Sequence, residues 1–154
     1  MAQIDSTNWD AAVTQCVRNL KSANLFTDEN AQAIIEPAIE VVLVKAKTAF
    51  ITAGHDNRKP RRTGGTAKAF TRSKTLQHEK KGGAPYMVVT LTGEDARDQR
   101  YGAKAFVLNY GRRRRGGIIK ADYHLTNAAR AVAPTVGAML VSKAEEIYTR
   151  NIQG

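Results

Sequence analysis

Apolar residues recur every three or four positions in three parts of the chain, a spacing typical of amphipathic helices. The first stripe predicts a helix at about 8–22. The second stripe follows Thr27 and Asp28, two residues that favour a helix start, and predicts a helix that runs to about Ala53. Pro37 lies inside this second stripe, so it predicts either a kink or a division into two helices.

The third stripe predicts a C-terminal helix with Asp122 as its capping residue. Pro134 and Gly137 lie inside this helix and predict a kink or a break near its middle. The side chains expected to face inward are Leu125, Ala128, Val132, Val136, Met139, Leu140, Ala144 and Ile147.

Two apolar runs between the second and third helices have the length and composition of strands. They are Tyr86–Thr92 and Ala105–Tyr110, the second within an expected strand Ala103–Tyr110. Because only a short polar segment separates the two runs, we expect them to pair antiparallel. Weaker signals predict one helical turn at Thr66–Phe70 and a strand at Ser73–His78.

The order of these elements is helix, helix, strands, helix, and it predicts an α+β fold. We expect a small antiparallel sheet packed by a long N-terminal helix pair and a C-terminal helix, with long basic loops. A chain of 154 residues suits a single domain, 1–154, and is long enough to bury a core. The sequence contains no internal repeat.

The net charge of +10 and the pI near 10 indicate a negatively charged partner: nucleic acid, an acidic protein surface or anionic lipid. Lipid is the weakest of these, because no apolar run has the length needed to span a membrane. The N-terminal sequence lacks the pattern of a signal peptide. The single cysteine, Cys16, excludes a disulfide within the chain and fits a reducing compartment.

The positive charge is concentrated in two segments. Residues 55–84 are basic and nearly free of large apolar side chains, so we expect much of this segment to be mobile until it binds a partner. Residues 111–117 hold four adjacent arginines between glycines, which predicts a solvated loop that joins a strand to a helix. The candidate partner- or DNA-contacting residues are Arg58, Lys59, Arg61, Arg62, Lys68, Arg72, Arg112, Arg113, Arg114 and Arg115.

Residues suited to catalysis are few, and their spacing does not favour a site. Cys16 lies within a helical stripe, so a buried structural thiol is the preferred interpretation. His55, His78 and His124 lack metal-ligand spacing, and for His124 we expect a surface or capping role. We therefore expect no enzymatic activity, no metal site and no cofactor. A cysteine-dependent enzyme stays as a third, weaker hypothesis.

Glu94, Asp95 and Asp98 form a cluster of carboxylates that could bind a metal ion. Arg97 and Arg100 lie among them, which favours a solvated loop whose charges neutralise one another. The basic segments lack an interleaved series of aromatic residues and the signatures of helix-turn-helix or zinc-finger modules. These features favour contact with a phosphate backbone over recognition of base sequence.

Three segments carry a resemblance to a known family. They are the basic threonine-glycine turn at 60–70, the stretch 101–111 that ends in Tyr110 and Gly111, and the alanine-rich helix from Asp122. In this order they resemble the neck or tail-completion proteins (minor tail components) of tailed bacteriophages. With the long helix before them, the resemblance covers about residues 27–150.

The sequence also departs from the family pattern at three places. Asn109 stands where many relatives have an acidic residue, 118–123 replaces the usual proline and phenylalanine, and the run of four arginines is unusual. These departures bear on the exact role within the family.

The resemblance implies a structural, non-enzymatic virion protein of the head–tail junction. Such subunits form a ring around the DNA channel and join the head connector to the tail. The implied partners are further copies of the chain, a head-completion or connector protein, and a tail terminator or tail-tube protein. The backbone of packaged DNA is a further partner that the resemblance leaves open. The implied location is the virion, and the host cytoplasm during assembly.

The residues alone support a second hypothesis from a different class. A soluble protein that binds nucleic acid without sequence preference, as a monomer or dimer, would also use the two basic segments.

Overall fold

The computed structural model describes residues 27–55, 65–78, 84–95, 98–114 and 116–153. The predicted helix at 8–22 and Cys16 lie outside these ranges. So do five of the candidate contact residues, which are Arg58, Lys59, Arg61, Arg62 and Arg115.

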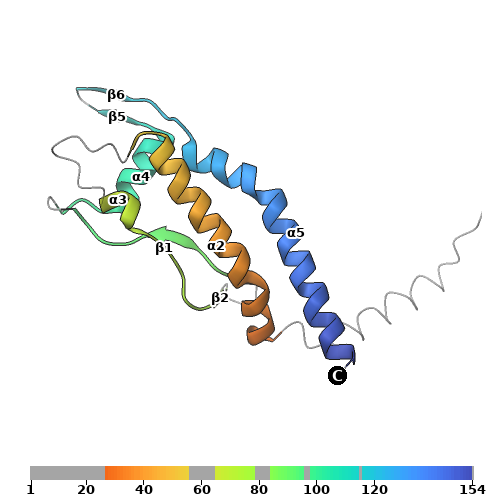
Figure 1. Cartoon of the computed structure of the whole chain (residues 1–154). Coiled ribbons are helices and arrows are strands. Elements are labelled where there is room, and N and C mark those ends of the chain that lie inside the picture. Colours follow the sequence, from red (N-terminus) through yellow and green to blue (C-terminus); the bar gives the residue numbers. More distant parts are fainter. Residues whose placement is uncertain (1–26, 56–64, 79–83, 96–97, 115, 154) are drawn as a thin grey trace, which may run out of the picture.

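The predicted α+β class is confirmed. Two long helices lie side by side along the molecule, and short helices and antiparallel two-stranded ribbons lie beside and beyond one end of the pair (Figure 1). The helices are α2 (Asp28–Thr52), α3 (Gly65–Lys68), α4 (Tyr101–Tyr110) and α5 (His124–Gln153). The ribbons pair β1 (Phe70–Arg72) with β4 (Val89–Leu91), β2 (Gln77–His78) with β3 (Pro85–Tyr86), and β5 (Arg112–Arg114) with β6 (Gly117–Ile119).

Helix α2 begins where the sequence predicts. Thr27 is its N-cap residue, and the Thr27 hydroxyl accepts a hydrogen bond from the Asn30 amide at 3.3 Å. The helix continues through Pro37 without division. Gly54, with φ of 77°, ends it, and the chain turns back so that the His55 amide donates to the Phe50 carbonyl.

The predicted strand Ala103–Tyr110 is wrong, because this segment forms helix α4. Its buried residues, Ala105 and Asn109, are four positions apart, and Phe106 and Tyr110 lie on the exposed side. In a short apolar run, the spacing of hydrophobic residues does not distinguish a strand from a buried helix. The two alanines, the leucine and the lysine of this segment have high helix propensity, which favours the helix.

The predicted pairing of Tyr86–Thr92 with the following apolar run is therefore also wrong. The Tyr86–Thr92 run divides into β3 and β4, with Met87 buried between them. Strand β4 pairs with β1 instead, and Leu91 lies opposite Phe70. Within the basic segment 55–84, residues 65–78 form α3, β1 and β2, so this part has defined structure. The helical turn predicted near Thr66 is confirmed. The strand predicted at Ser73–His78 is shorter than expected, since β2 has two residues.

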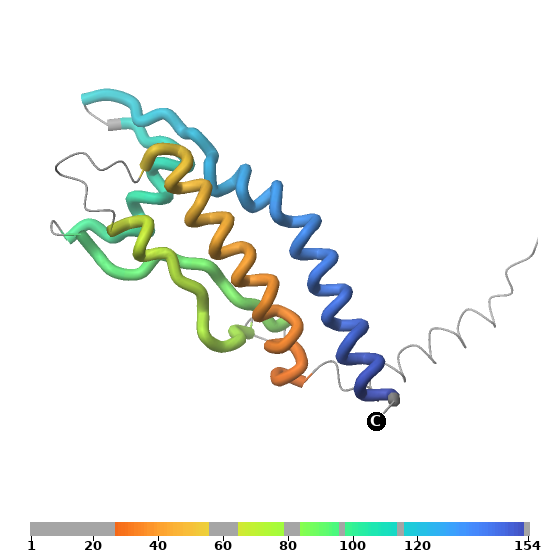
Figure 2. The backbone as a smooth tube through the Cα atoms, in the orientation of Figure 1, coloured from red at the N-terminus to blue at the C-terminus, as the bar shows by residue number. Residues whose placement is uncertain are grey.

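Helix α5 is one continuous helix through Pro134 and Gly137, so no break occurs. Figures 1 and 2 show that it changes direction after its first few turns and then runs along α2. The bend fits the kink that Pro134 predicts, since proline removes one helix hydrogen bond. None of the helices in the described part of the chain is both long and apolar enough to cross a membrane.

The core is small and lies at the end of the molecule where α2 finishes. Phe50, Ala67, Phe70 and Ala105 form its buried centre, and the rings of Phe50 and Phe70 meet edge to face at 5.5 Å. The partly buried side chains around this centre are Leu43, Ala46, Val89, Leu91, Leu108 and Leu125. The core therefore joins α2, α3, β1, β4, α4 and the start of α5, and it supports the elements that carry the arginines.

Candidate functional site

Three residues of the arginine run, Arg112–Arg114, lie on a β-hairpin that projects from one end of the molecule (Figure 1). The sequence predicts a solvated loop here, and the structure shows that Arg112–Arg114 form strand β5 of the hairpin. Arg112 lies opposite Ile119, and Arg113 lies opposite Ile118. Backbone pairing thus holds this part of the run extended.

Both ends of the hairpin are fixed to the last turn of α4. Gly111 follows α4 with φ of 78°, and its amide donates to the Val107 carbonyl at 2.8 Å. After β6, the Tyr123 amide donates a hydrogen bond to the Asn109 carbonyl at 3.0 Å. The chain therefore leaves and re-enters the body at one helix end, which gives the hairpin a rigid base.

The positive charge on this hairpin is accessible. The side chains of Arg112 and Arg113 are exposed, and within the described ranges neither makes an ion pair. Successive side chains of a strand point to opposite faces, so these two guanidinium groups are presented on the two faces of the hairpin. Such an arrangement can contact phosphates or carboxylates on more than one side.

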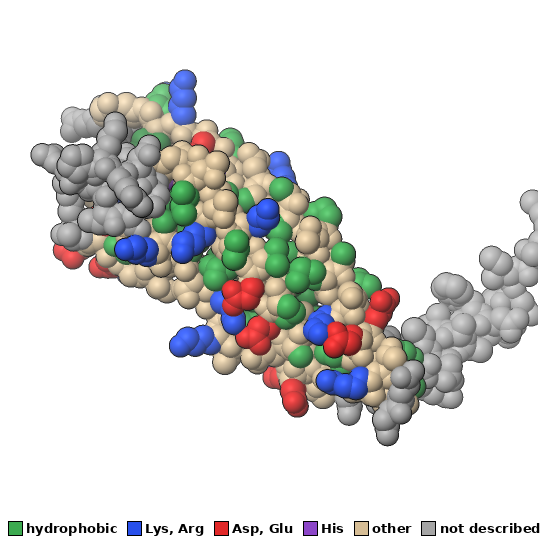
Figure 3. All heavy atoms as spheres, viewed as in Figure 1, with side chains coloured by type: hydrophobic (Ala, Val, Ile, Leu, Met, Phe, Trp, Pro, Cys, Tyr) green, Lys and Arg blue, Asp and Glu red, His purple; other side chains and the backbone are tan. Residues whose placement is uncertain are grey.

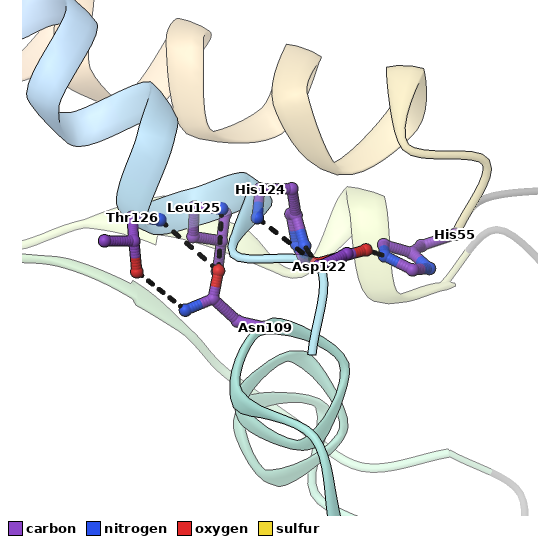
Figure 4. Close-up of polar contacts among 6 residues, drawn as sticks. All are labelled: His55, Asn109, Asp122, His124, Leu125 and Thr126. Carbon is purple, nitrogen blue, oxygen red and sulfur yellow. Dashed lines mark hydrogen bonds and ion pairs between the residues drawn. The ribbon is translucent and has the colours of Figure 1, made fainter. Parts of the chain in front are cut away.

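Asn109 connects the hairpin base to α5. It comes from α4 and is 2% exposed. The Asn109 Oδ1 accepts hydrogen bonds from the amides of Leu125 at 2.8 Å and Thr126 at 3.3 Å, and its Nδ2 donates to the Thr126 hydroxyl at 2.9 Å (Figure 4). A side chain of one helix thus satisfies free amides in the first turn of another.

An aromatic patch lies beside the hairpin base. Its members are Phe106, Tyr110 and Tyr123, with ring centroids 4.8 Å apart for the first pair and 6.3 Å for Tyr110 and Tyr123. Phe106 is 62% exposed, and both tyrosines are about half exposed. Large apolar side chains that remain in solvent at one place are typical of contact surfaces.

A groove of about 480 Å³ adjoins the aromatic patch, between α4 and the start of α5. The residues that line it include the buried Ala105 and Asn109 and the exposed Arg130. Phe106 and Tyr110 belong to both the patch and the groove. The hairpin, the patch and the groove together form one candidate interaction surface of mixed positive and apolar character.

Two other predicted contact residues lie away from this surface. Arg72, on β1, bonds through its guanidinium to Glu40 and to Glu36 of α2, the latter at 2.8 Å. The hydrogen bond to Glu40 is the main cause that raises the pKa of Arg72. This arginine thus links β1 to α2. Lys68, at the end of α3, is exposed.

The acidic loop has one of the ion pairs that the sequence predicts, with Arg100, while Arg97 lies outside the described residues. Glu94 pairs with Arg100 at 3.4 Å, and Asp95 pairs with Lys104 of α4. The Asp95 carboxylate also accepts a hydrogen bond from the Gln99 amide at 2.9 Å. These charges neutralise one another and hold the loop against α4.

The fold brings two of the histidines together around one carboxylate. The Asp122 carboxylate lies between His55, just after α2, and His124, the first residue of α5, and contacts Nε2 of the former and Nδ1 of the latter (Figure 4). Partial burial raises the pKa of Asp122, but the hydrogen bonds from His124 and His55 outweigh it and lower the pKa to about 2. The expected surface position of His124 is wrong, because its side chain is 5% exposed.

Sequence reasoning missed these groupings for identifiable reasons. Asn109 was a polar residue inside an apolar run, which was the available signal for a buried capping role. His55 and Asp122 are 67 positions apart, so local spacing cannot show that they meet. The exposure of Phe106 and Tyr110 depends on the helical conformation of their segment, which places both side chains on one face of α4.

Comparison with known proteins gives no relative. No family model matches the chain, and neither the curated proteins nor the solved structures include a match.

Proposed function

We propose that this chain is a structural virion protein of the head–tail junction of a tailed bacteriophage, a neck or tail-completion subunit. In this role the subunit forms a ring with further copies of itself around the DNA channel. The ring joins the head-completion or connector protein to the tail terminator or tail-tube protein. The proposal starts from the sequence resemblance over about 27–150 and assigns no enzymatic activity.

The observation that supports this role best is the arginine hairpin on its rigid base. Arg112 and Arg113 are exposed and unpaired among the described residues, and the hairpin extends beyond the body of the subunit. In a ring, every copy would present the same hairpin. Repeated guanidinium groups bind DNA backbone without reading sequence, or bind an acidic surface on an adjacent ring.

Exposed apolar side chains elsewhere also suit a subunit of an assembly. Val44 and Val141 are each 59% exposed, and Ile51 is 45% exposed. Figure 3 shows hydrophobic side chains that gather across the face formed by α2 and α5. A ring would remove such side chains from water, which favours association.

The test replaces Arg112 and Arg113 with glutamine, which removes two charges and keeps the length of the hairpin side chains. A matched control replaces Lys74 and Arg150, two exposed cationic residues away from the hairpin, in the same way. Both variants should keep the stability of the parent chain within about 0.5 kcal/mol, because the changed side chains are on the surface.

Only the hairpin variant should fail in function. Electron microscopy of particles assembled with it should show separate heads and tails, or joined particles that have lost DNA, and the titre of infectious particles should fall. Normal particles and titre with the hairpin variant would contradict the proposal.

The alternative is a sequence-independent nucleic-acid-binding protein that acts as a monomer or dimer, and the same exposed arginines favour it. It requires tight binding of duplex DNA by the isolated chain, with a strong dependence on salt. In a gel-shift titration, loss of two phosphate contacts in the Arg112→Gln/Arg113→Gln variant should lower the salt slope by about 2. Closed rings in electron micrographs of the purified chain, with weak DNA binding, would favour the neck protein instead.

A further inference from the structure

We propose that His55, Asp122 and His124 form a binding site for a divalent transition-metal ion, with Zn²⁺ as the expected ion. One ligand atom from each of the three side chains lies within 4.8 Å of the others. The site is independent of the proposed role in the virion, and it rests on four features of the fold.

The first feature is the set of donor atoms. Two imidazole nitrogens and one carboxylate oxygen are ligands that Zn²⁺ takes in proteins, and a site with three protein ligands leaves a position for water or another ligand. The Asp122 carboxylate lies between the two imidazoles, whose ring centroids are 4.6 Å apart. An ion bound by both rings would therefore also be within reach of the carboxylate.

The second feature is a nitrogen that the hydrogen bonds leave without a partner. His124 bonds to Asp122 through Nδ1, and its Nε2 is buried with no hydrogen-bond partner in the part of the chain that the structure describes. Buried polar atoms in proteins are almost always paired, so an unpaired one needs an explanation. Only an ion held through Nε2 would give this atom a partner, whereas an ion held through Nδ1 would take the place of the hydrogen bond to Asp122.

The third feature is the way the fold holds the ligands. His55 follows the turn that ends α2, and its ring packs at 5.3 Å from Phe50. His124 is in the first turn of α5, and its ring lies 5.6 Å from the same phenylalanine. The two histidines are thus positioned by the hydrophobic core, which fixes their rings before an ion binds.

The fourth feature is access. The side chain of Asp122 is 36% exposed and that of His55 is 16% exposed, so an ion can reach the cluster from solvent. A bound ion would connect the end of α2 to the start of α5 beside the hairpin base. We expect it to stabilise the native chain, since the three ligands come together only in the folded state.

The experiment uses the full chain, freed of metal by a chelator and then titrated with Zn²⁺ by calorimetry, with thermal unfolding followed in parallel. We expect one ion per chain and a rise in Tm of several degrees at saturating Zn²⁺. His55→Gln removes one ligand and should weaken Zn²⁺ binding by about tenfold or more. His78→Gln is the matched control, because His78 is an exposed histidine outside the cluster, and it should leave binding unchanged.

A measurement on the unmodified chain keeps the test valid if His55→Gln does not fold. Nitrogen-15 spectra of the imidazoles should show that Zn²⁺ shifts the resonances of His55 and His124 and leaves those of His78 in place. No binding of Zn²⁺, equal affinity in the His55→Gln variant, or shifts confined to His78 would each overturn the proposal.

Discussion

At the scale of single residues, Asn109 is a buried polar residue that joins two helices. Its side chain makes three hydrogen bonds to α5, and its carbonyl accepts a fourth from the Tyr123 amide. All four bonds connect the last turn of α4 to the segment that follows the hairpin. Asn109 therefore determines how the hairpin base and α5 are placed relative to each other.

We predict that Asn109→Ala lowers the free energy of unfolding by about 2–4 kcal/mol, because the amides of Leu125 and Thr126 lose their acceptor and a small cavity forms. Chemical denaturation followed by circular dichroism measures this change. Asn109→Asp is the matched control, because it keeps an acceptor oxygen for both amides. It should cost clearly less than alanine, and equal losses in the two variants would contradict the capping role.

The Asn109→Asp variant also introduces the type of residue that is found at this position in the family that the sequence resembles. Many proteins of the suggested family have an acidic residue where this chain has Asn109. A carboxylate there could accept the same two amide hydrogen bonds, and a negative charge is favourable at a helix N-terminus. The departure from the family pattern is thus compatible with the geometry at this position.

At the scale of elements, the junction between α4 and β5 depends on Gly111. Its φ of 78° is unfavourable for other residues, and a Cβ atom at this position would lie 2.7 Å from the Ile119 carbonyl oxygen and 2.8 Å from the Ala121 nitrogen. Both neighbours are backbone atoms of the returning side of the hairpin. The hairpin can approach α4 this closely only because residue 111 has no side chain.

Gly111→Ala should therefore destabilise the chain by about 3 kcal/mol or more, since backbone strain and a steric clash act together. Gly116→Ala is the control within the same hairpin, because no atom lies within 4 Å of a Cβ built there. Thermal unfolding of the two variants should show a large decrease in Tm for the first and a change within error for the second. Similar Tm values would show that the hairpin does not pack on α4 as described.

The elements also show what the sequence could and could not predict. Helices α2 and α5 were predicted with nearly correct limits, because long stripes and start signals such as Thr27 are local features. The segment Ala103–Tyr110, which lies within α4, was assigned to the wrong type of element, because a short and mostly apolar run fits both a strand and a helix. The partner of β4 then had to be wrong as well, since its true partner, β1, lies in a segment read as basic and mobile.

The candidate site was also predictable only in part. The exposure of Arg112 and Arg113 follows from their charge and was expected from the sequence. The meeting of His55 with Asp122 and His124 depends on how the end of α2 packs against the start of α5, which no local pattern encodes. Long-range packing therefore decides which of the chemically suitable residues come together.

At the scale of the whole molecule, the described chain has a small core and an extended surface with exposed apolar side chains. Ile118, on β6 of the hairpin, is 68% exposed, and the aromatic patch of Phe106, Tyr110 and Tyr123 lies beside the hairpin base. If the proposed ring forms, this patch is the surface that we expect a neighbouring subunit to cover.

Phe106→Gln should then weaken self-association by about 1.5–3 kcal/mol for each interface, the value for removing a buried phenylalanine side chain from an apolar contact. The stability of the single subunit should change by less than about 0.5 kcal/mol, because Phe106 is 62% exposed within it. Sedimentation velocity over a range of concentrations measures the association. Lys74→Gln provides a control at an exposed site between β1 and β2, and an equal effect of the two changes would argue against the patch as an interface.

The length of α5 has a mechanical consequence. Its 30 residues span about 45 Å, and the helix starts at the hairpin base and ends at the opposite extremity of the molecule (Figure 1). Backbone hydrogen bonds continue on both sides of the bend near Pro134, so a small rotation of the first turn of α5 becomes a displacement of several ångströms at the far end. A spectroscopic probe pair at the two extremities would thus report on docking at the tip by a change in orientation at the other.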